Sequence, residues 1–291
     1  MTIPSALRWA LLLLSLLAVG PLCSAMIADA RDADGGPAVS MLVGGHIPRT
    51  LLAGLLVFVG AGVVGWLGSR FFALSTGFAC AGIVLAWGAW RTGTFDQLVR
   101  RTHGGSELPM LAVEGAIALL GSAAIAWLCW HASRAHRPGA APGAAAERQS
   151  FMSHFASAKD ERTLPKVAIA SMLLSAVAGA AIAYILAASP LKGQSVFAAF
   201  AGAIVAGMAA QFVAQAMHAS ATPVSVVLGL VVPAVVVPLI AKGDSALVAH
   251  TFANSMLPIA KVMPLDWAAG AVLGAPIGLG WAGAMMDVRM V

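Results

Sequence analysis

Hydrophobic and polar positions alternate along this chain in long blocks. Apolar runs of about 20 residues, the length that crosses a hydrocarbon core, are separated by shorter polar stretches. The ten-residue segments of alternating hydrophobicity that indicate a membrane β-barrel do not occur. The pattern therefore predicts an all-α, polytopic transmembrane helical bundle with about eight spans. The predicted spans are 6–27, 50–68, 71–90, 110–130, 166–188, 195–217, 222–241 and 265–286.

The longest polar segment, 131–165, divides these spans into four and four. Its core, "HRPGAAPGAAAER", is rich in Pro, Ala and Gly, which is typical of a flexible linker. The expected organisation is a front membrane half (1–130), a linker and a back membrane half (166–291). A second polar stretch, 29–49, is rich in Asp and Gly and is predicted to be a solvated linker.

Two segments depart from a simple spanning pattern. Residues 245–261 are too few and too polar to span, so they predict a short interfacial or re-entrant helix before the last span. Residues 6–27 fit either a first spanning helix or a cleaved signal peptide, because Ala28-Asp29-Ala30 resembles a cleavage site. Both interpretations of the first segment stay open.

Composition agrees with a membrane environment. The chain is 60% hydrophobic and only 10% charged, whereas soluble domains carry about 25% charged residues. The sequence pI is about 9.6, but the basic residues are scattered among loops, which argues against nucleic-acid binding. The partner expected first is the lipid bilayer.

Charge distribution predicts an orientation. The linker and the residue after it, Lys166, carry six basic residues, so the positive-inside rule places the linker in the cytoplasm. Both termini are then cytoplasmic if the first segment is retained, in a bacterial-type inner (plasma) membrane. Arg91, Arg100 and Arg101 fall on the other side and weaken the bias. Spans five to seven lack tryptophan and are rich in alanine, so we expect them at the centre of the bundle.

Three polar residues form a stripe near the end of the sixth span. At about 100° per residue, Gln211, Gln215 and His218 lie at about 0°, 40° and 340° on a helix. Neutral amides in a membrane either bridge helices or line a polar path. We favour bridging for the two glutamines and place His218 at the cytoplasmic interface.

Glu114 is the one acidic residue inside an apolar run and away from its extreme end. A carboxylate there is costly unless it lies near the headgroups, is paired or is protonated. We expect it to snorkel or to pair with Arg100 or Arg101. The functional alternative is an acid that couples transport to protons or cations in an internal cavity.

Prolines and glycines mark two of the last spans. Pro233 and Pro238 lie inside the seventh span and predict helix bends. Gly270, Gly274 and Gly278 recur every four residues in the last span and predict a helix-packing groove. The sequence leaves open whether the helix in that groove belongs to this chain or to another copy.

The sequence lacks the common catalytic, nucleotide-binding and metal-binding motifs. It contains no HExxH, GxSxG, Walker or dinucleotide motif, and its three cysteines form no metal-binding spacing. We therefore expect no cofactor, no bound metal and no catalytic residues, and an intramembrane enzyme is the least supported class.

Two functional hypotheses remain. The favoured one is a non-catalytic structural or assembly subunit, in a homo-oligomer or with other membrane subunits. The alternative is a small permease-like transporter with a polar path through spans five to seven, lined by Glu114, Gln211 and Gln215. The shortage of buried ionisable residues favours the first. No class of small-molecule substrate is indicated.

Overall fold

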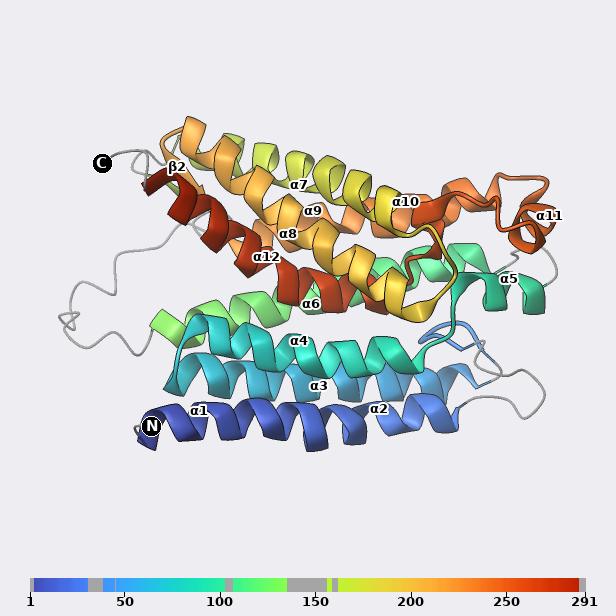
Figure 1. The fold of residues 1–291 in the computed structure, drawn as a ribbon, viewed down its shortest axis with the longest axis horizontal. Helices are drawn as coiled ribbons and strands as arrows, with labels where there is room; N and C mark the ends of the chain where they lie inside the picture. The colour runs from blue at the N-terminus through green and yellow to red at the C-terminus, as the bar shows by residue number, and fades with distance from the viewer. Residues whose placement is uncertain are drawn as a thin grey trace.

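The computed structural model describes residues 3–30, 39–44, 46–102, 107–134, 156–158 and 162–287, and these form an all-α helical bundle, as predicted (Figure 1). The core of the predicted linker lies outside the described residues. In chain order the elements are α1 (Ile3–Leu14), the π-helical segment η1 (Ser15–Val19), α2 (Gly20–Asp29), α3 (Ile47–Phe71), α4 (Leu74–Arg91), α5 (Phe95–Thr102), α6 (Leu108–Arg134), β1 (Ala156–Ala158), α7 (Leu164–Leu186), α8 (Lys192–Ala216), β2 (Ala219–Ala221), α9 (Pro223–Gly229), α10 (Val231–Lys242), α11 (Leu247–Phe252), the 3-10 helix η4 (Pro258–Lys261) and α12 (Pro264–Asp287).

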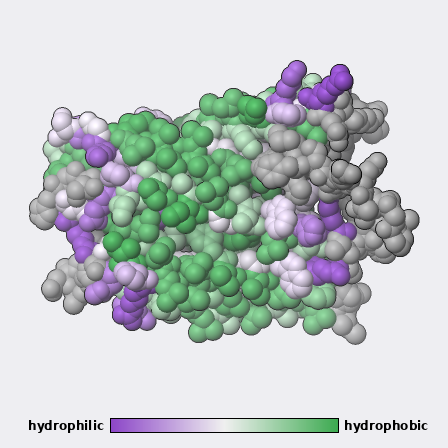
Figure 2. Space-filling view, turned by 180° about the vertical axis from the view of Figure 1, so that it is seen from behind, coloured by the Kyte–Doolittle hydropathy of each residue, from purple (hydrophilic) through white to green (hydrophobic). Residues whose placement is uncertain are grey.

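Seven helical segments of the described chain are long and apolar enough to cross a membrane. The one predicted span that is not among these seven, 71–90, corresponds to α4, a helix of 18 residues that packs against α3 and α12. Figure 2 shows the apolar surface as a broad green belt between two polar ends. The fold class and the membrane environment are thus confirmed.

The helices form two layers with α6 between them (Figure 1). The first segment (α1, η1 and α2), α3 and α4 lie on one side, and α7, α8, α9, α10 and α12 lie on the other. Helix α6 contacts α3 as well as α10 and α12, so the last span of the front half is also packed against the back half. We call the end that carries α5, α11 and η4 the cap end, and the end where α6 stops and α7 begins the linker end.

The expected central position of span five is wrong. Helix α7 exposes a stripe of large apolar side chains, among them Ile169, Leu173, Val177 and Ile185. Its small residues instead form the face that packs on α8, where Gly179 and Gly202 come close. Alanine content therefore reports close packing on one side of α7, not burial on all sides.

Part of the predicted solvated linker is buried. Residues 39–44, which we call the plug, insert at the cap end, and Val39, Ser40, Met41 and Val43 are at most 3% exposed. The Thr50 hydroxyl donates to the Met41 carbonyl at 2.8 Å. This burial was missed because the stretch has no helical periodicity, and its backbone groups find partners only in the folded chain.

The segment 245–261 does not form one helix. It contains α11, with six residues, and η4, with four. Asn254 adopts a left-handed conformation (φ 52°) between them and Pro258 begins η4, so helix continuity is lost. At 1.5 Å per residue α11 is only about 9 Å long, in agreement with the prediction that this segment is short.

The seventh span is interrupted where the prolines predict. Helix α9 ends at Gly229 and α10 begins at Val231. Pro233 has no N–H to donate to the carbonyl of Gly229, which explains a break at this position. Pro238 lies inside α10.

The glycine groove of α12 is filled by α8 of the same chain. A Cβ atom on Gly270 would lie 2.5 Å from the Ala199 carbonyl carbon, and one on Gly274 would lie 2.6 Å from the Phe200 carbonyl oxygen. A Cβ on Gly278 would collide with the Ile204 carbonyl oxygen. These three glycines therefore allow backbone-to-backbone contact between α12 and α8.

A two-stranded antiparallel sheet at the linker end was not predicted. Ala156 pairs with Ala221, and Ala158 pairs with Ala219. The strands precede α7 and follow α8, and His218 turns the chain between α8 and β2 with φ 55°. Three-residue strands are too short to show a period of two in the sequence.

Candidate functional site

A buried ion pair joins α8 and α12 at the cap end. Lys192 is the first residue of α8, and its Nζ lies 2.7 Å from Oδ1 of Asp266. The Asp266 side chain is fully buried and that of Lys192 is 13% exposed. Oδ2 of Asp266 accepts hydrogen bonds from the Ser195 hydroxyl (2.8 Å) and the Met263 backbone N–H (3.1 Å). An acid in the first turn that reaches back to the preceding N–H is the second half of a capping box, which explains the local position of Asp266.

Lys192 extends this interaction to the front half. Its ammonium group also donates to Thr92 Oγ1 at 2.9 Å and to the Gly93 carbonyl at 3.3 Å. An ammonium group has three donors, and here they meet α12 and the end of α4. The pair therefore links the two layers of the bundle.

Glu114 belongs to the same end of the molecule. Its carboxylate accepts hydrogen bonds from the Ser40 hydroxyl and from the Leu42 backbone N–H, the latter at 2.9 Å. The plug is joined in turn to Gly93, whose N–H donates to the Val39 carbonyl at 2.9 Å. We call Asp266, Lys192, Ser195, Thr92, Gly93, Glu114 and the plug the polar network.

The expected snorkelling of Glu114 is wrong. The side chain is fully buried, because the plug covers it and supplies its hydrogen-bond donors. The guanidinium of Arg100, one of its two expected partners, instead lies over the Phe252 ring at 4.6 Å. Burial of a carboxylate requires hydrogen bonds of this kind to offset its lost hydration.

The cap is tied to the bundle by a second buried cation. Nζ of Lys261 donates to the Ala188 carbonyl at 2.7 Å and to Asn254 Oδ1 at 2.9 Å. Burial lowers the pKa of the Lys261 ammonium, and the nearby Asp96 carboxylate opposes this by raising it. These contacts fasten η4 to the loop between α7 and α8.

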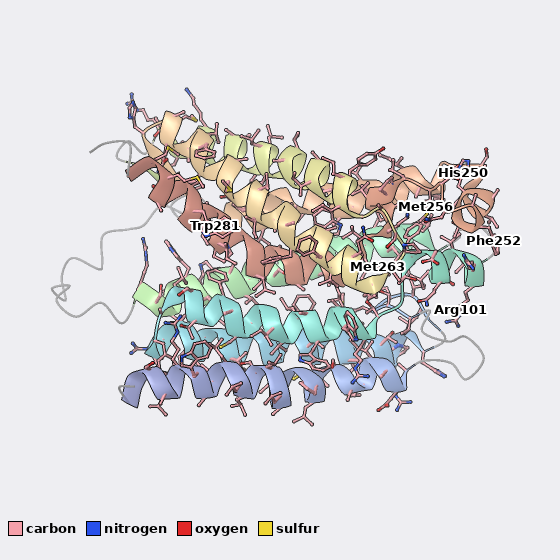
Figure 3. The ribbon with its side chains drawn as sticks, viewed as in Figure 1. Arg101, His250, Phe252, Met256, Met263 and Trp281 are labelled. Carbon is pink, nitrogen blue, oxygen red and sulfur yellow. The ribbon has the colours of Figure 1, made fainter. Side chains whose placement is uncertain are left out.

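Two exposed contacts order the outer surface of the cap. His250 Nδ1 lies 2.7 Å from Asp244 Oδ2, and this hydrogen bond holds the pKa of Asp244 below its usual value. The Arg100 contact with Phe252 joins α5 to α11. Figure 3 shows His250, Phe252 and Met256 together at this end, beside Arg101.

The predicted glutamine stripe lies far from Glu114. Oε1 of Gln211 accepts a hydrogen bond from the Ala221 N–H at 3.2 Å, which joins α8 to β2. Gln215 is one turn closer to the linker end, and His218 is exposed there. The structure thus brings Glu114 to one end of the bundle and the stripe to the other. In the contact described, Gln211 bridges two elements of the chain.

Sequence reasoning missed Lys192 and most of the role of Asp266. Lys192 precedes the predicted span 195–217 and Asp266 is the second residue of the span 265–286, and charged residues at span ends are ordinarily solvated. The position of Asp266, in the first turn and three residues after Met263, is a capping signal that was available in the sequence. Its pairing with a lysine 74 residues away required the fold.

No metal centre emerges from the described residues. They include no group of three or more His, Cys, Asp and Glu side chains able to hold a metal ion. Two grooves among them have apolar linings, one of about 660 Å³ between α3 and α6 and one of about 270 Å³ over α4. Chemically, the arrangement serves to hold helices together and to present apolar surface to the membrane.

Comparison with known proteins returned no match: no family model, curated protein or solved structure is similar to this chain. Functional inference therefore starts from its own residues.

Proposed function

We propose that this chain is a non-catalytic structural or assembly subunit of a membrane complex, in a bacterial-type inner membrane with both termini cytoplasmic. The observation that carries the proposal is the polar network. Its two carboxylates and its ammonium group bond to side chains and backbone of this chain, so they join α4, α6, α8 and α12. Such groups fix the arrangement of helices, and arrangement is what an assembly subunit supplies.

A groove on the surface of the bundle, between α3 and α6, also supports the proposal. Its lining is almost entirely apolar and includes Gly62, Gly121 and Ala124. Small residues allow another helix to approach closely, which is how transmembrane helices associate. We assign this groove to a transmembrane helix of a partner subunit.

Photo-crosslinking in native membranes tests this assignment. Val63 lines the groove and Val177 lies on the exposed face of α7, with 53% and 67% exposure respectively. A photoreactive amino acid at position 63 should give one discrete protein adduct, whereas the same residue at 177 should give lipid adducts only. Lipid adducts alone at both positions would count against an assembly role.

The transporter hypothesis is favoured by one observation, the depth of the buried charges. Ionisable residues inside membrane segments often mark ion or substrate pathways, and the fold buries Glu114, Lys192 and Asp266 at one end. A path through the bundle would also have to reach Gln211 and Gln215 near the other end.

Cysteine accessibility separates the two hypotheses. In a background without native cysteines, Gln211→Cys and Gln215→Cys are compared with Ala210→Cys and Ala214→Cys, which replace fully buried alanines. Protection of all four from a membrane-impermeant thiol reagent is expected for a structural subunit. Selective labelling of 211 and 215 would show a water-filled path and favour the transporter.

A further inference from the structure

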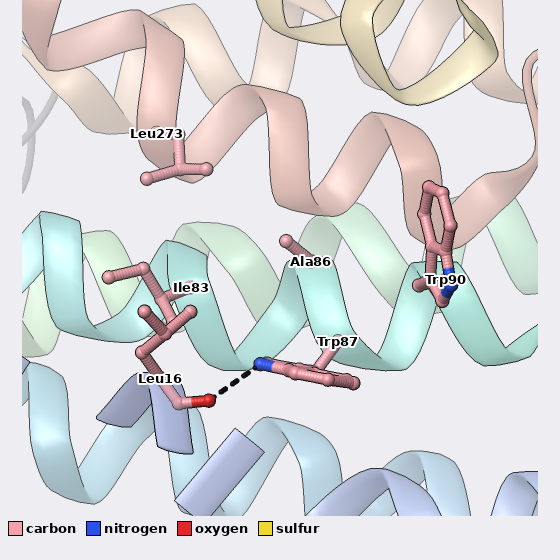
Figure 4. A pocket seen from close by; sticks show the side chains of 6 residues that line it. All are labelled: Leu16, Ile83, Ala86, Trp87, Trp90 and Leu273. Carbon is pink, nitrogen blue, oxygen red and sulfur yellow. Dashed lines mark hydrogen bonds between the residues drawn. The ribbon is translucent and has the colours of Figure 1, made fainter. Parts of the chain in front are cut away.

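The smaller of the two grooves lies over α4, between the first helical segment and α12 (Figure 4). It is lined by Leu16, Ile83, Ala86, Trp87, Trp90 and Leu273 and has a volume of about 270 Å³. Trp90 is 57% exposed and Leu16 is 42% exposed, so the groove opens to the surface. Its walls come from both layers of the bundle.

One wall of this groove is held in place by a specific contact. The indole Nε1–H of Trp87 donates to the Leu16 carbonyl at 2.9 Å, as the dashed line in Figure 4 shows. Leu16 lies in the π-helical segment η1, and π-helical turns are frequent at functional sites. A Cβ atom on Gly20 would collide with the Trp87 ring, so glycine is required for this ring position.

A cation lies over the ring of Trp87, one of the residues that line the groove. Arg91 is the last residue of α4, and its Cζ is 5.8 Å from the centroid of the Trp87 ring. The 18 residues of α4 span about 27 Å, close to the thickness of a hydrocarbon core of about 30 Å. From this length we place Trp90 and Arg91 at the depth of the lipid headgroups, with Ile83 and Ala86 beside acyl chains.

We propose that this groove is a binding site for a single membrane phospholipid, with one acyl chain against Ile83, Ala86 and Trp87 and the phosphate against Arg91. The apolar lining fits a hydrocarbon chain, and the guanidinium of arginine binds phosphate through charge-assisted hydrogen bonds. Tryptophan is the side chain best suited to the boundary between the two. This site is independent of the proposed assembly role, because it uses a different face of the molecule.

Native mass spectrometry of the full chain tests the site. The protein is purified in mild detergent, delipidated and titrated with dioleoyl phosphatidylglycerol. The wild type should retain one lipid at low molar ratios. Arg91→Gln removes the phosphate contact and should weaken retention about tenfold, the value of one charge-assisted hydrogen bond. Ala86→Phe fills the groove and should abolish the one-lipid species.

Arg49→Gln is the matched control, since Arg49 is an exposed arginine at the same end of the bundle. It should bind lipid like the wild type, and soluble glycerol phosphate should not displace the lipid from either protein. Equal retention by wild type, Arg91→Gln and Ala86→Phe would overturn the proposal, as would displacement by glycerol phosphate. Because Arg91 is not one of the residues that line the groove, Arg91→Gln leaves the groove unfilled and remains informative if Ala86→Phe fails to fold.

Discussion

Single atoms decide how closely α12 and α8 approach. The carbonyl oxygen of Ile204 lies where the side chain of any residue other than glycine at position 278 would begin, whereas Gly280 has no such neighbour within 4 Å. Of these two glycines on one helix, Gly280 can therefore be replaced by a larger residue and Gly278 cannot. The periodic motif identified the first one from the sequence, but only the structure shows which helix it contacts.

Gly278→Ala should destabilise the protein by about 1–3 kcal/mol, because the added methyl group forces two backbones apart. Gly280→Ala should be neutral or stabilising by up to about 1 kcal/mol, because alanine is the better helix former. Unfolding in mixed micelles with increasing sodium dodecyl sulfate measures both. The oligomeric state should be unchanged in each variant, and a Gly278→Ala protein as stable as Gly280→Ala would contradict the packing described.

The ion pair between Lys192 and Asp266 should show strong non-additivity. Lys192→Met leaves a buried carboxylate without its cation and should cost about 3–5 kcal/mol. Adding Asp266→Asn removes that charge and should recover most of the loss, because an amide still accepts the Ser195 and Met263 hydrogen bonds. A double-mutant cycle of unfolding free energies measures the coupling. Additive losses would show that the two side chains are not paired.

At the scale of elements, the plug is the part that sequence reasoning could not place. Apolar runs predict membrane helices, and each predicted span has a helix at its position. The plug has no periodic pattern, and its burial depends on Glu114 and Thr50, on α6 and α3 respectively. Only folding brings those donors and acceptors together, so a stretch rich in glycine and polar residues appeared solvated.

Glu114→Ala should release the plug without unfolding the bundle. In a cysteine-free background, Met41→Cys should resist a membrane-impermeant thiol reagent, because Met41 is 3% exposed. The same cysteine should be labelled once Glu114→Ala has removed the two acceptors for Ser40 and Leu42. His46→Cys, at an exposed position beside the plug, should be labelled in both backgrounds. Protection of Met41→Cys in the Glu114→Ala protein would show that the carboxylate does not hold the plug.

At the scale of the molecule, the bundle and its membrane environment were predictable and the pairing of helices was not. Hydropathy reports which segments enter the membrane, but it cannot say that α6 lies between the layers or that α7 lies at the edge. Those relations depend on which small residues face each other, as Gly179 and Gly202 do. The sequence also did not predict that Lys192 and Asp266 are buried, because their burial depends on how the elements at the cap end pack together.

The fold places α1, the end of α12 and the start of α7 at the same end of the bundle (Figure 1). With the proposed orientation, a fluorescent protein fused after Val291 should mature in the cytoplasm, and a protease site inserted at Gly143 should be cut only in inverted vesicles. A protease site inserted after Asp244, at the cap end, should be cut only from the opposite side. Cleavage of both sites from one side would contradict the arrangement of the helices. If each site were cut only from the side opposite to the one expected, the arrangement would hold and the proposed orientation would be wrong.

The position of α6 has a consequence for biogenesis. Ribosomes deliver the chain from its N-terminus, so Glu114 and the plug that donates hydrogen bonds to it are both present before residue 166 is made. The contacts of Thr92 and Gly93 with Lys192 can form only once residue 192 has been made. The ion pair of Lys192 can form only after Asp266, the last member of the polar network to be synthesised. The Lys192–Asp266 pair is thus the last contact of the polar network that can form, and until residue 266 is made the Lys192 ammonium group lacks its carboxylate.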